Sequence, residues 1–181
     1  MYEMKIIKNT LKSNLNIRTQ KDFPKKGIEF IDINPLILQK ESFNEIINKF
    51  YDEIKDKNVD YIIGPEARGF LIGSAVSYKL GIGFIPIRKK GKLPPKTVEK
   101  SFSYEKEYGI DTLQLPKLVN DDYKNKNIYI IDDIYATGNT VSGIKSALKE
   151  LGANFVGVGV ILNIKELNND LVYSLIDVNE E

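Results

Sequence analysis

Residues Ile128–Thr140, IYIIDDIYATGNT, decide the fold of this chain and point to its chemistry. The first four residues are apolar without alternation, which is typical of a strand buried on both faces of a parallel sheet. Two acids follow, Asp132 and Asp133, and then a turn with Gly138 that leads into an amphipathic stretch. A strand, a glycine turn and a helix in this order favour an α/β protein that binds its ligand at the carboxyl end of the strand.

Apolar runs of the same kind recur along the chain, with amphipathic stretches between several of them. The expected strands are Val59–Ile63, Phe84–Ile87, Phe155–Leu162 and Leu171–Val178. Helical spacing is set by Phe43, Ile46, Ile47, Phe50 and Ile54, by Phe70, Leu71, Ala75, Val76 and Leu80 before Gly81, and by Val141, Ile144, Ala147, Leu148 and Leu151 before Gly152. This alternation predicts an α/β fold in one domain, residues 1–181, with a mainly parallel twisted sheet flanked by helices.

Two segments depart from the alternation. Residues 1–40 contain Pro24, Gly27 and Pro35, which interrupt any long element. Residues 89–127 form a long connection without a clear helix, and within it Val98–Tyr104 and Ile110–Leu115 can pair as a hairpin. Because long connections without structure are commonly lids or disordered, we expect residues 92–115 to form a flexible lid.

The composition excludes several classes of function. The 181 residues include no cysteine and no histidine, which excludes disulfides, thiolate nucleophiles, histidine bases and histidine-ligated metals. The 26 basic and 25 acidic residues give a net charge of +1, so no bulk field favours nucleic acid. No apolar run has the length of a membrane helix, and the N-terminus lacks the apolar region of a signal peptide. We therefore expect a soluble, cytoplasmic protein without nucleic-acid or membrane partners.

The acids and the turn after Ile131 fit a sugar phosphate. The amides at the start of the helix and the hydroxyls of Thr137 and Thr140 suit a phosphate, and Gly138 allows close approach. Sugar hydroxyls would separate that phosphate from the two carboxylates. The alternative is a strand that ends in solvated acids, with a Thr or Asn capping the helix.

Cations follow two other expected strands. Gly64–Phe70 contains Arg68, whose guanidinium can grip paired oxygens of a diphosphate, and Ile87–Pro94 contains Arg88, Lys89 and Lys92. Without further context, Arg68 could equally be a surface residue in a first helical turn, and the second group a solvated loop.

The segment Ile128–Thr140 resembles the phosphoribosyl-pyrophosphate (PRPP) signature of type I phosphoribosyltransferases. The resemblance implies that family's fold, with an N-terminal hood over residues 1–40 and a flexible lid. It also implies that Asp132 and Asp133 hold the ribose. The other residues it implies for binding PRPP and AMP are Ala136, Thr137, Gly138, Asn139 and Thr140 for the phosphate, and Glu66, Ala67, Arg68, Arg88, Lys89 and Lys92 for the pyrophosphate. A cis peptide is expected at Glu66–Ala67.

Two further elements resemble the adenine-specific members of the family. Ser103–Gly109 matches their S-Y-x-x-E-Y-G element, and Asp22–Phe30 matches their D-F-P-x-x-G-x-x-F element. The resemblance implies a hood in which Phe30 covers adenine while the main chain around it reads the base edge, so the adenine-binding residues are Ile28, Glu29, Phe30 and Ile31. Ile31 stands where the family usually has Arg or Lys, and Asn163 stands where it often has Glu. The resemblance does not extend into Leu167–Glu181.

The resemblance implies transfer of ribose 5-phosphate from PRPP to adenine, giving AMP and pyrophosphate through an oxocarbenium-like transition state. Glu107 is the candidate for proton exchange with the base, Arg68 acts on the leaving group, and Tyr108 belongs to the lid. Mg²⁺ would bind with PRPP and water, and a homodimer is expected. The alternatives are a transferase for hypoxanthine, guanine or xanthine, or a PRPP-binding regulator without catalysis.

Overall fold

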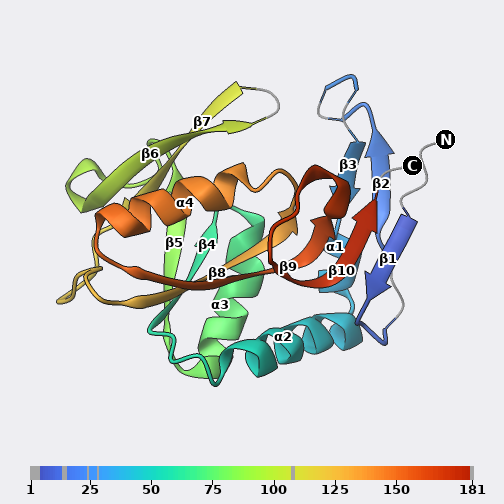
Figure 1. The fold of residues 1–181 in the computed structure, drawn as a ribbon, viewed down its shortest axis with the longest axis horizontal. Coiled ribbons are helices and arrows are strands. Elements are labelled where there is room, and N and C mark those ends of the chain that lie inside the picture. The colour runs from blue at the N-terminus through green and yellow to red at the C-terminus, as the bar shows by residue number, and fades with distance from the viewer. Residues whose placement is uncertain (1–4, 14–15, 24, 28, 107–108, 180–181) are drawn as a thin grey trace.

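The computed structural model of the chain describes residues 5–13, 16–23, 25–27, 29–106 and 109–179. Within these residues an eight-stranded mixed sheet has the order β1-β10-β9-β8-β4-β5-β7-β6 (Figure 1). The strands from β10 to β5 run parallel, and β1, β7 and β6 extend the sheet with antiparallel pairings. The strands are β1 Lys5–Asn9, β4 Tyr61–Pro65, β5 Gly83–Lys89, β6 Val98–Lys106, β7 Gly109–Pro116, β8 Asn127–Tyr135, β9 Asn154–Ile164 and β10 Tyr173–Asn179.

Strand β8 is buried on both faces, as its uninterrupted apolar sequence predicts. Tyr129 and Ile131 belong to a hydrophobic core shared with α2 (Lys40–Ile54) and α3 (Arg68–Leu80). Ile128 and Ile130 belong to a second core with α4 (Asn139–Glu150). The α/β architecture predicted from the sequence is therefore confirmed, with helices on both faces of the sheet (Figure 1).

The three predicted helices are present, and one apolar face was partly misassigned. Leu71 was counted in the apolar face of this helix, but it is 48% exposed, so that assignment is wrong. The stripe of α3 that lies on the sheet contains Gly69, Ile72, Gly73, Val76 and Ser77. Small residues in this stripe let the helix approach the strands closely, and apolar spacing alone does not reveal them.

The N-terminal segment is divided between two sheets. β2 (Arg18–Lys21) and β3 (Glu29–Asp32) form a separate two-stranded sheet, followed by the short helix α1 (Asn34–Leu38). β1, by contrast, pairs with β10 at the edge of the main sheet. The described parts of residues 1–40, which the prediction treated as one hood region, thus contribute strands to both sheets.

The predicted hairpin is confirmed as β6 and β7, and a short 3₁₀ turn at Pro95–Thr97 precedes it. A second 3₁₀ turn, at Lys165–Leu167, follows β9. The hairpin is anchored in the second core by Leu113 and Leu115 of β7 and, closer to its tip, by Tyr104 of β6. Only the outer part of this hairpin stands clear of the sheet (Figure 1).

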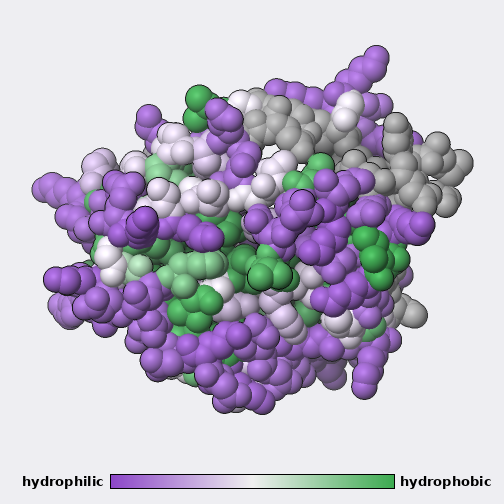
Figure 2. Space-filling model, viewed as in Figure 1, coloured by the Kyte–Doolittle hydropathy of each residue, from purple (hydrophilic) through white to green (hydrophobic). Residues whose placement is uncertain are grey.

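The topology places a binding site between β4 and β8. The chain passes from β4 to β5 on one side and from β8 to β9 on the other, so loops after β4 and β8 diverge at their carboxyl ends. Such a switch point is the usual ligand site of an open parallel sheet. Most of the surface in Figure 2 is hydrophilic, with a band of hydrophobic residues below α4. No helix within the described residues is long and apolar enough to cross a membrane.

Candidate functional site

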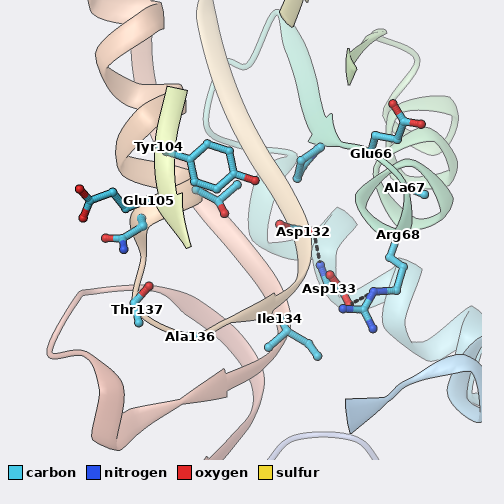
Figure 3. Close-up of a pocket in the computed structure, with 13 residues that line it drawn as sticks. Glu66, Ala67, Arg68, Tyr104, Glu105, Asp132, Asp133, Ile134, Ala136 and Thr137 are labelled. Atoms are coloured by element: carbon cyan, nitrogen blue, oxygen red, sulfur yellow. Dashed lines mark hydrogen bonds and ion pairs between the residues drawn. The ribbon is translucent and has the colours of Figure 1, made fainter. Parts of the chain in front are cut away.

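A cavity of about 360 Å³ lies at the carboxyl ends of β4 and β8. Figure 3 shows Glu66, Ala67 and Arg68 on one side of it and Tyr104 and Glu105 of β6 across from them, with the end of β8 between. The structure therefore brings three separate parts of the chain together. The predicted site residues that line this cavity are Glu66, Ala67, Arg68, Asp132, Asp133, Ala136, Thr137, Asn139 and Thr140.

An ion pair links the two strand ends. Arg68 Nε lies 2.7 Å from Asp133 Oδ2, and the Asp133 side chain is only 6% exposed (Figure 3). Gly69 makes this approach possible, because a Cβ there would lie 2.7 Å from Pro65 and 3.0 Å from the Ile131 carbonyl oxygen. The first turn of α3 thus lies directly against the end of β8. The Glu66–Ala67 peptide before it is cis, as predicted.

The two adjacent acids have different environments. Asp132 Oδ1 accepts a hydrogen bond of 2.9 Å from the backbone N–H of Asp133. Burial raises the pKa of Asp132 well above its ordinary value, and the charge of Asp133 adds to the increase. Asp133 is instead neutralised by Arg68. The pair can therefore offer two carboxyl groups in different surroundings to a ligand with hydroxyls.

The predicted phosphate loop has the geometry of an anion site. Gly138 precedes α4 with φ of 78°, a conformation that favours glycine, and the helix begins at Asn139. Thr137, Asn139 and Thr140 line the cavity, so the N-terminus of α4 borders it. A helix N-terminus attracts anions because its first amides lack partners within the helix. Gly138 itself borders a second cavity behind the loop.

The predicted cations do not line the cavity: Arg88 and Lys89 are the last residues of β5, and Lys92 follows it. Arg88 Nε donates to Glu66 Oε2 at 3.0 Å, and the backbone N–H of Lys89 donates to the same oxygen at 2.9 Å. These contacts lower the pKa of Glu66, with the Lys89 amide as the larger cause. Lys92 is exposed on the turn that follows. The cations thus connect to the cavity through Glu66.

The hood reaches the site through Arg68. The Arg68 guanidinium lies 5.3 Å from the centre of the Phe30 ring, and Arg68 Nη1 donates to the carbonyl oxygen of Ile31 at 3.3 Å. Phe23 packs edge-on against Phe30. Glu29 belongs to β3. Ile28 and the two lid residues Glu107 and Tyr108 lie outside the described residues.

Four cavity residues were not singled out from the sequence: Pro65, Tyr104, Glu105 and Ile134. Pro65 lies in the segment Gly64–Phe70 and Ile134 in the segment Ile128–Thr140. Both could have been found because they are next to Glu66 and Asp133 in the sequence. Tyr104 and Glu105 lie in the matched element Ser103–Gly109 and approach the cavity because β6 packs beside α4. That packing is a long-range contact which no local pattern in the sequence encodes.

Comparisons with known proteins agree with this geometry. A family model described as the phosphoribosyl transferase domain matches residues 32–175. The adenine phosphoribosyltransferase of Clostridium acetobutylicum is 44% identical over 153 residues, which cover 84% of this chain and 87% of that protein. The crystal structure of adenine phosphoribosyltransferase from Thermoanaerobacter pseudethanolicus has a TM-score of 0.78 and 36% identity, covering 89% of this chain and 95% of that one. The crystal structure of the Saccharomyces cerevisiae enzyme, solved with adenine and an imino-altritol bisphosphate, has a TM-score of 0.76 and 33% identity. The match covers 88% of this chain and 93% of that one.

Proposed function

The chain belongs to the phosphoribosyl transferase family, and we propose that it is an adenine phosphoribosyltransferase, converting adenine and PRPP to AMP and pyrophosphate. The observation that carries this proposal is the single cavity in which Arg68, the acid pair and the loop before α4 meet. The loop before α4 suits the 5′-phosphate of PRPP, the two acids suit the ribose hydroxyls, and the Arg68 guanidinium suits the diphosphate. The fold and the sequence relatives support the same assignment.

The ribose 5-phosphate part of the substrate is held by the end of β8 and the loop after it. Asp132 and Asp133 accept hydrogen bonds from the ribose hydroxyls. The 5′-phosphate lies against the amides and hydroxyls from Ala136 to Thr140, where the start of α4 stabilises its negative charge. Fixing the sugar in this way leaves its anomeric carbon as the point of reaction.

The diphosphate part is held by the segment Glu66–Arg68, with Arg88, Lys89 and Lys92 in support. Arg68 stabilises the charge that develops on the leaving pyrophosphate. Glu66 orders Arg88 and the backbone of Lys89, so it sets the direction from which these cations meet the anion. Movement of Lys92 and Lys89 toward bound PRPP would complete the complement of positive charge.

Mg²⁺ fits the same cavity. The diphosphate and ribose oxygens of PRPP, together with water, would hold the ion, and the carboxyl oxygens of Asp132 and Asp133 lie in the same cavity. When bound, the ion would neutralise charge on the leaving group. Addition of EDTA should abolish AMP formation, and Mg²⁺ in excess should restore it.

The base is held by the hood, in which Phe30 covers adenine and the main chain of Ile28, Glu29 and Ile31 reads its edge. Glu107 accepts the proton that leaves the imidazole ring when the new bond forms, and Tyr108 helps to close the lid. Because Tyr104, Leu113 and Leu115 are anchored in the core, closure is restricted to the outer part of the predicted lid, residues 92–115. Closure excludes water, which would otherwise hydrolyse PRPP.

The test is to follow absorbance changes of adenine, hypoxanthine and guanine separately with PRPP and Mg²⁺. We expect AMP from adenine and at most slow reaction of the oxopurines. Comparable rates with hypoxanthine or guanine would contradict adenine selectivity, and PRPP binding without turnover would indicate a regulator. We also propose a cytoplasmic homodimer. Light scattering on the purified chain should give twice the 20.6 kDa of the monomer, and a monomer would refute that part.

A further inference from the structure

The segment after β9 contacts the phosphate loop from the side away from the cavity. Asn168 Nδ2 donates to the carbonyl oxygen of Ala136 at 2.8 Å. The same amide group donates to Asn163 Oδ1 at 3.0 Å and to the Ile164 carbonyl oxygen at 2.9 Å. In Figure 3 the faint red ribbon of this segment passes below Ala136 and Thr137, opposite Tyr104.

The orientation of the Asn168 carboxamide is fixed by its partners. Its Nδ2 faces only oxygen acceptors, and its Oδ1 accepts from the Asp170 backbone N–H at 3.2 Å. Asn163, one of those acceptors, is fully buried and pairs in register with Tyr135 across β8 and β9. The contact with Ala136 thus comes from a side chain that has little freedom to turn.

A second contact holds the other end of the loop. The Tyr135 hydroxyl donates to Asp170 Oδ2 at 2.6 Å, and burial followed by this bond raises the pKa of Tyr135. Gly138 lies against the same pair, since a Cβ there would be 2.5 Å from the Tyr135 hydroxyl oxygen and 3.0 Å from Asp170 Oδ2. Asn168 and the Tyr135–Asp170 pair therefore support both Ala136 and Gly138.

Peptide geometry carries this support into the cavity. A trans peptide is planar, and its C=O and N–H point in opposite directions. Anchoring the Ala136 carbonyl on Asn168 therefore directs the Thr137 N–H to the other side, toward the cavity that Ala136 and Thr137 line. The turn at Gly138, held against Tyr135 and Asp170, sets the start of α4 in the same way.

From these contacts we infer that Asn168 and the Tyr135–Asp170 pair are positioning residues for the 5′-phosphate of the phosphoribosyl substrate. They touch no substrate themselves and act through the backbone from Ala136 to Gly138. The inference rests on the proposed function, in which this loop binds the 5′-phosphate, and it gives a role to Asn168 and Asp170, for which the motifs read from the sequence implied none.

The experiment compares two ligands by calorimetry: ribose 5-phosphate, which carries the 5′-phosphate, and inorganic pyrophosphate, which does not. Asn168→Asp keeps size and the acceptor for Asp170 but removes the donors to Ala136. Asn169→Asp is the matched control, because it adds the same charge to the same segment at an exposed residue. Tyr135→Phe removes the second contact without a change of charge.

For Asn168→Asp we expect the Kd of ribose 5-phosphate to rise about tenfold, the scale of one or two lost hydrogen bonds. Tyr135→Phe should raise it about threefold to tenfold on the same basis. Pyrophosphate affinity should stay within about twofold of wild type in both variants, since none of these bonds involves the segment Glu66–Arg68. If Asn168→Asp does not fold, Tyr135→Phe carries the test.

An unchanged affinity for ribose 5-phosphate, or an equal loss for both ligands, would overturn the inference, and so would an effect of Asn169→Asp as large as that of Asn168→Asp. Failure of the proposed function has a different signature. In that case the wild type makes no AMP from adenine, while the selective loss of ribose 5-phosphate binding in the variants still supports the positioning role for another phosphoribosyl substrate.

Discussion

Replacement of Asp133 by asparagine should separate the chemistry of the site from the stability of the fold. Asp133 is a nearly buried carboxylate paired at 2.7 Å with Arg68, whose side chain is 35% exposed. Removing one partner of a fully buried ion pair costs about 3–5 kcal/mol, because the other charge is left without a partner. Arg68 can instead turn to water, so the cost for Asp133→Asn is smaller.

A second effect offsets part of that cost. The charge of Asp133 is one cause of the raised pKa of Asp132, so Asp133→Asn lowers the pKa of Asp132 toward its ordinary value and relieves a repulsion. We expect a net loss of about 1 kcal/mol in the free energy of unfolding, which lowers the Tm by about 2–4 °C for a chain of this size. Asp132 also binds its proton more tightly in the folded state, so wild-type stability falls as pH rises from about 4 through the raised pKa. This slope should be shallower in the variant.

Activity should fall much further than stability. The variant loses a charged acceptor for a ribose hydroxyl, and such a bond contributes about 1.5–3 kcal/mol. The kcat/KM for PRPP should therefore fall about 10- to 150-fold. The assay is AMP formation at saturating adenine with PRPP varied, together with thermal unfolding followed by circular dichroism.

Asp121→Asn is the matched control for this experiment. Asp121 is also paired with a cation, Lys126 Nζ at 3.0 Å, and accepts from the Tyr61 hydroxyl, but it lies near the amino end of β4, away from the cavity. Its loss should lower the Tm without changing kcat/KM for PRPP. A kcat/KM for PRPP within about threefold of wild type in a folded Asp133→Asn variant would refute the ribose role.

Three further predictions concern the other side chains of the site. Arg68→Lys should lose most activity and weaken pyrophosphate binding, since the single charge of lysine cannot replace the two-pronged guanidinium. Pyrophosphate affinity close to that of the wild type would mean that Arg68 is only a surface charge. Glu107→Gln should lower kcat by about 10²–10⁴-fold with little change in PRPP affinity, and a parallel loss of binding would remove Glu107 from proton transfer. The lowered pKa of Glu66 contributes stability above its unfolded pKa that is lost as pH falls through the folded value. Glu66→Gln should therefore flatten the acid side of the stability profile, and an unchanged profile measured by urea unfolding at several pH values would contradict this.

The sequence predicted those parts of the fold whose residues are buried or conformationally restricted. β8 and β4 read as strands because both of their faces pack into cores. β1 was missed because all five of its residues are exposed at the sheet edge, so no burial pattern marks it. Leu71 was misassigned because Phe70, Leu71 and Ile72 are consecutive apolar residues, and only the approach of α3 to the sheet decides which of them is buried.

The residues of the candidate site also differ in whether the sequence could predict them. Residues on loops directly after strands, such as Asp133 and Arg68, could be placed because the sheet topology brings strand ends together. Asn168 could not be placed, because its contact with Ala136 joins residues 32 positions apart through a segment without regular structure. Sequence patterns report local geometry and burial, whereas supporting contacts of this kind depend on the tertiary fold.

Arg68 shows how the two kinds of information combine. The chain has 26 basic residues, of which only Arg18, Arg68 and Arg88 are arginine, so an arginine at this position suggests a need for its particular shape. In the structure the Nε atom pairs with Asp133, Nη1 donates to the carbonyl oxygen of Ile31, and the planar face lies against the Phe30 ring. A lysine has one nitrogen and no planar face, so it could not make all three contacts together. The same guanidinium thus connects the hood, the end of β8 and the loop assigned to pyrophosphate, and a ligand that draws Arg68 away from Asp133 must also change the surroundings of Phe30. Binding of PRPP and binding of the base are therefore expected to depend on each other through this one side chain.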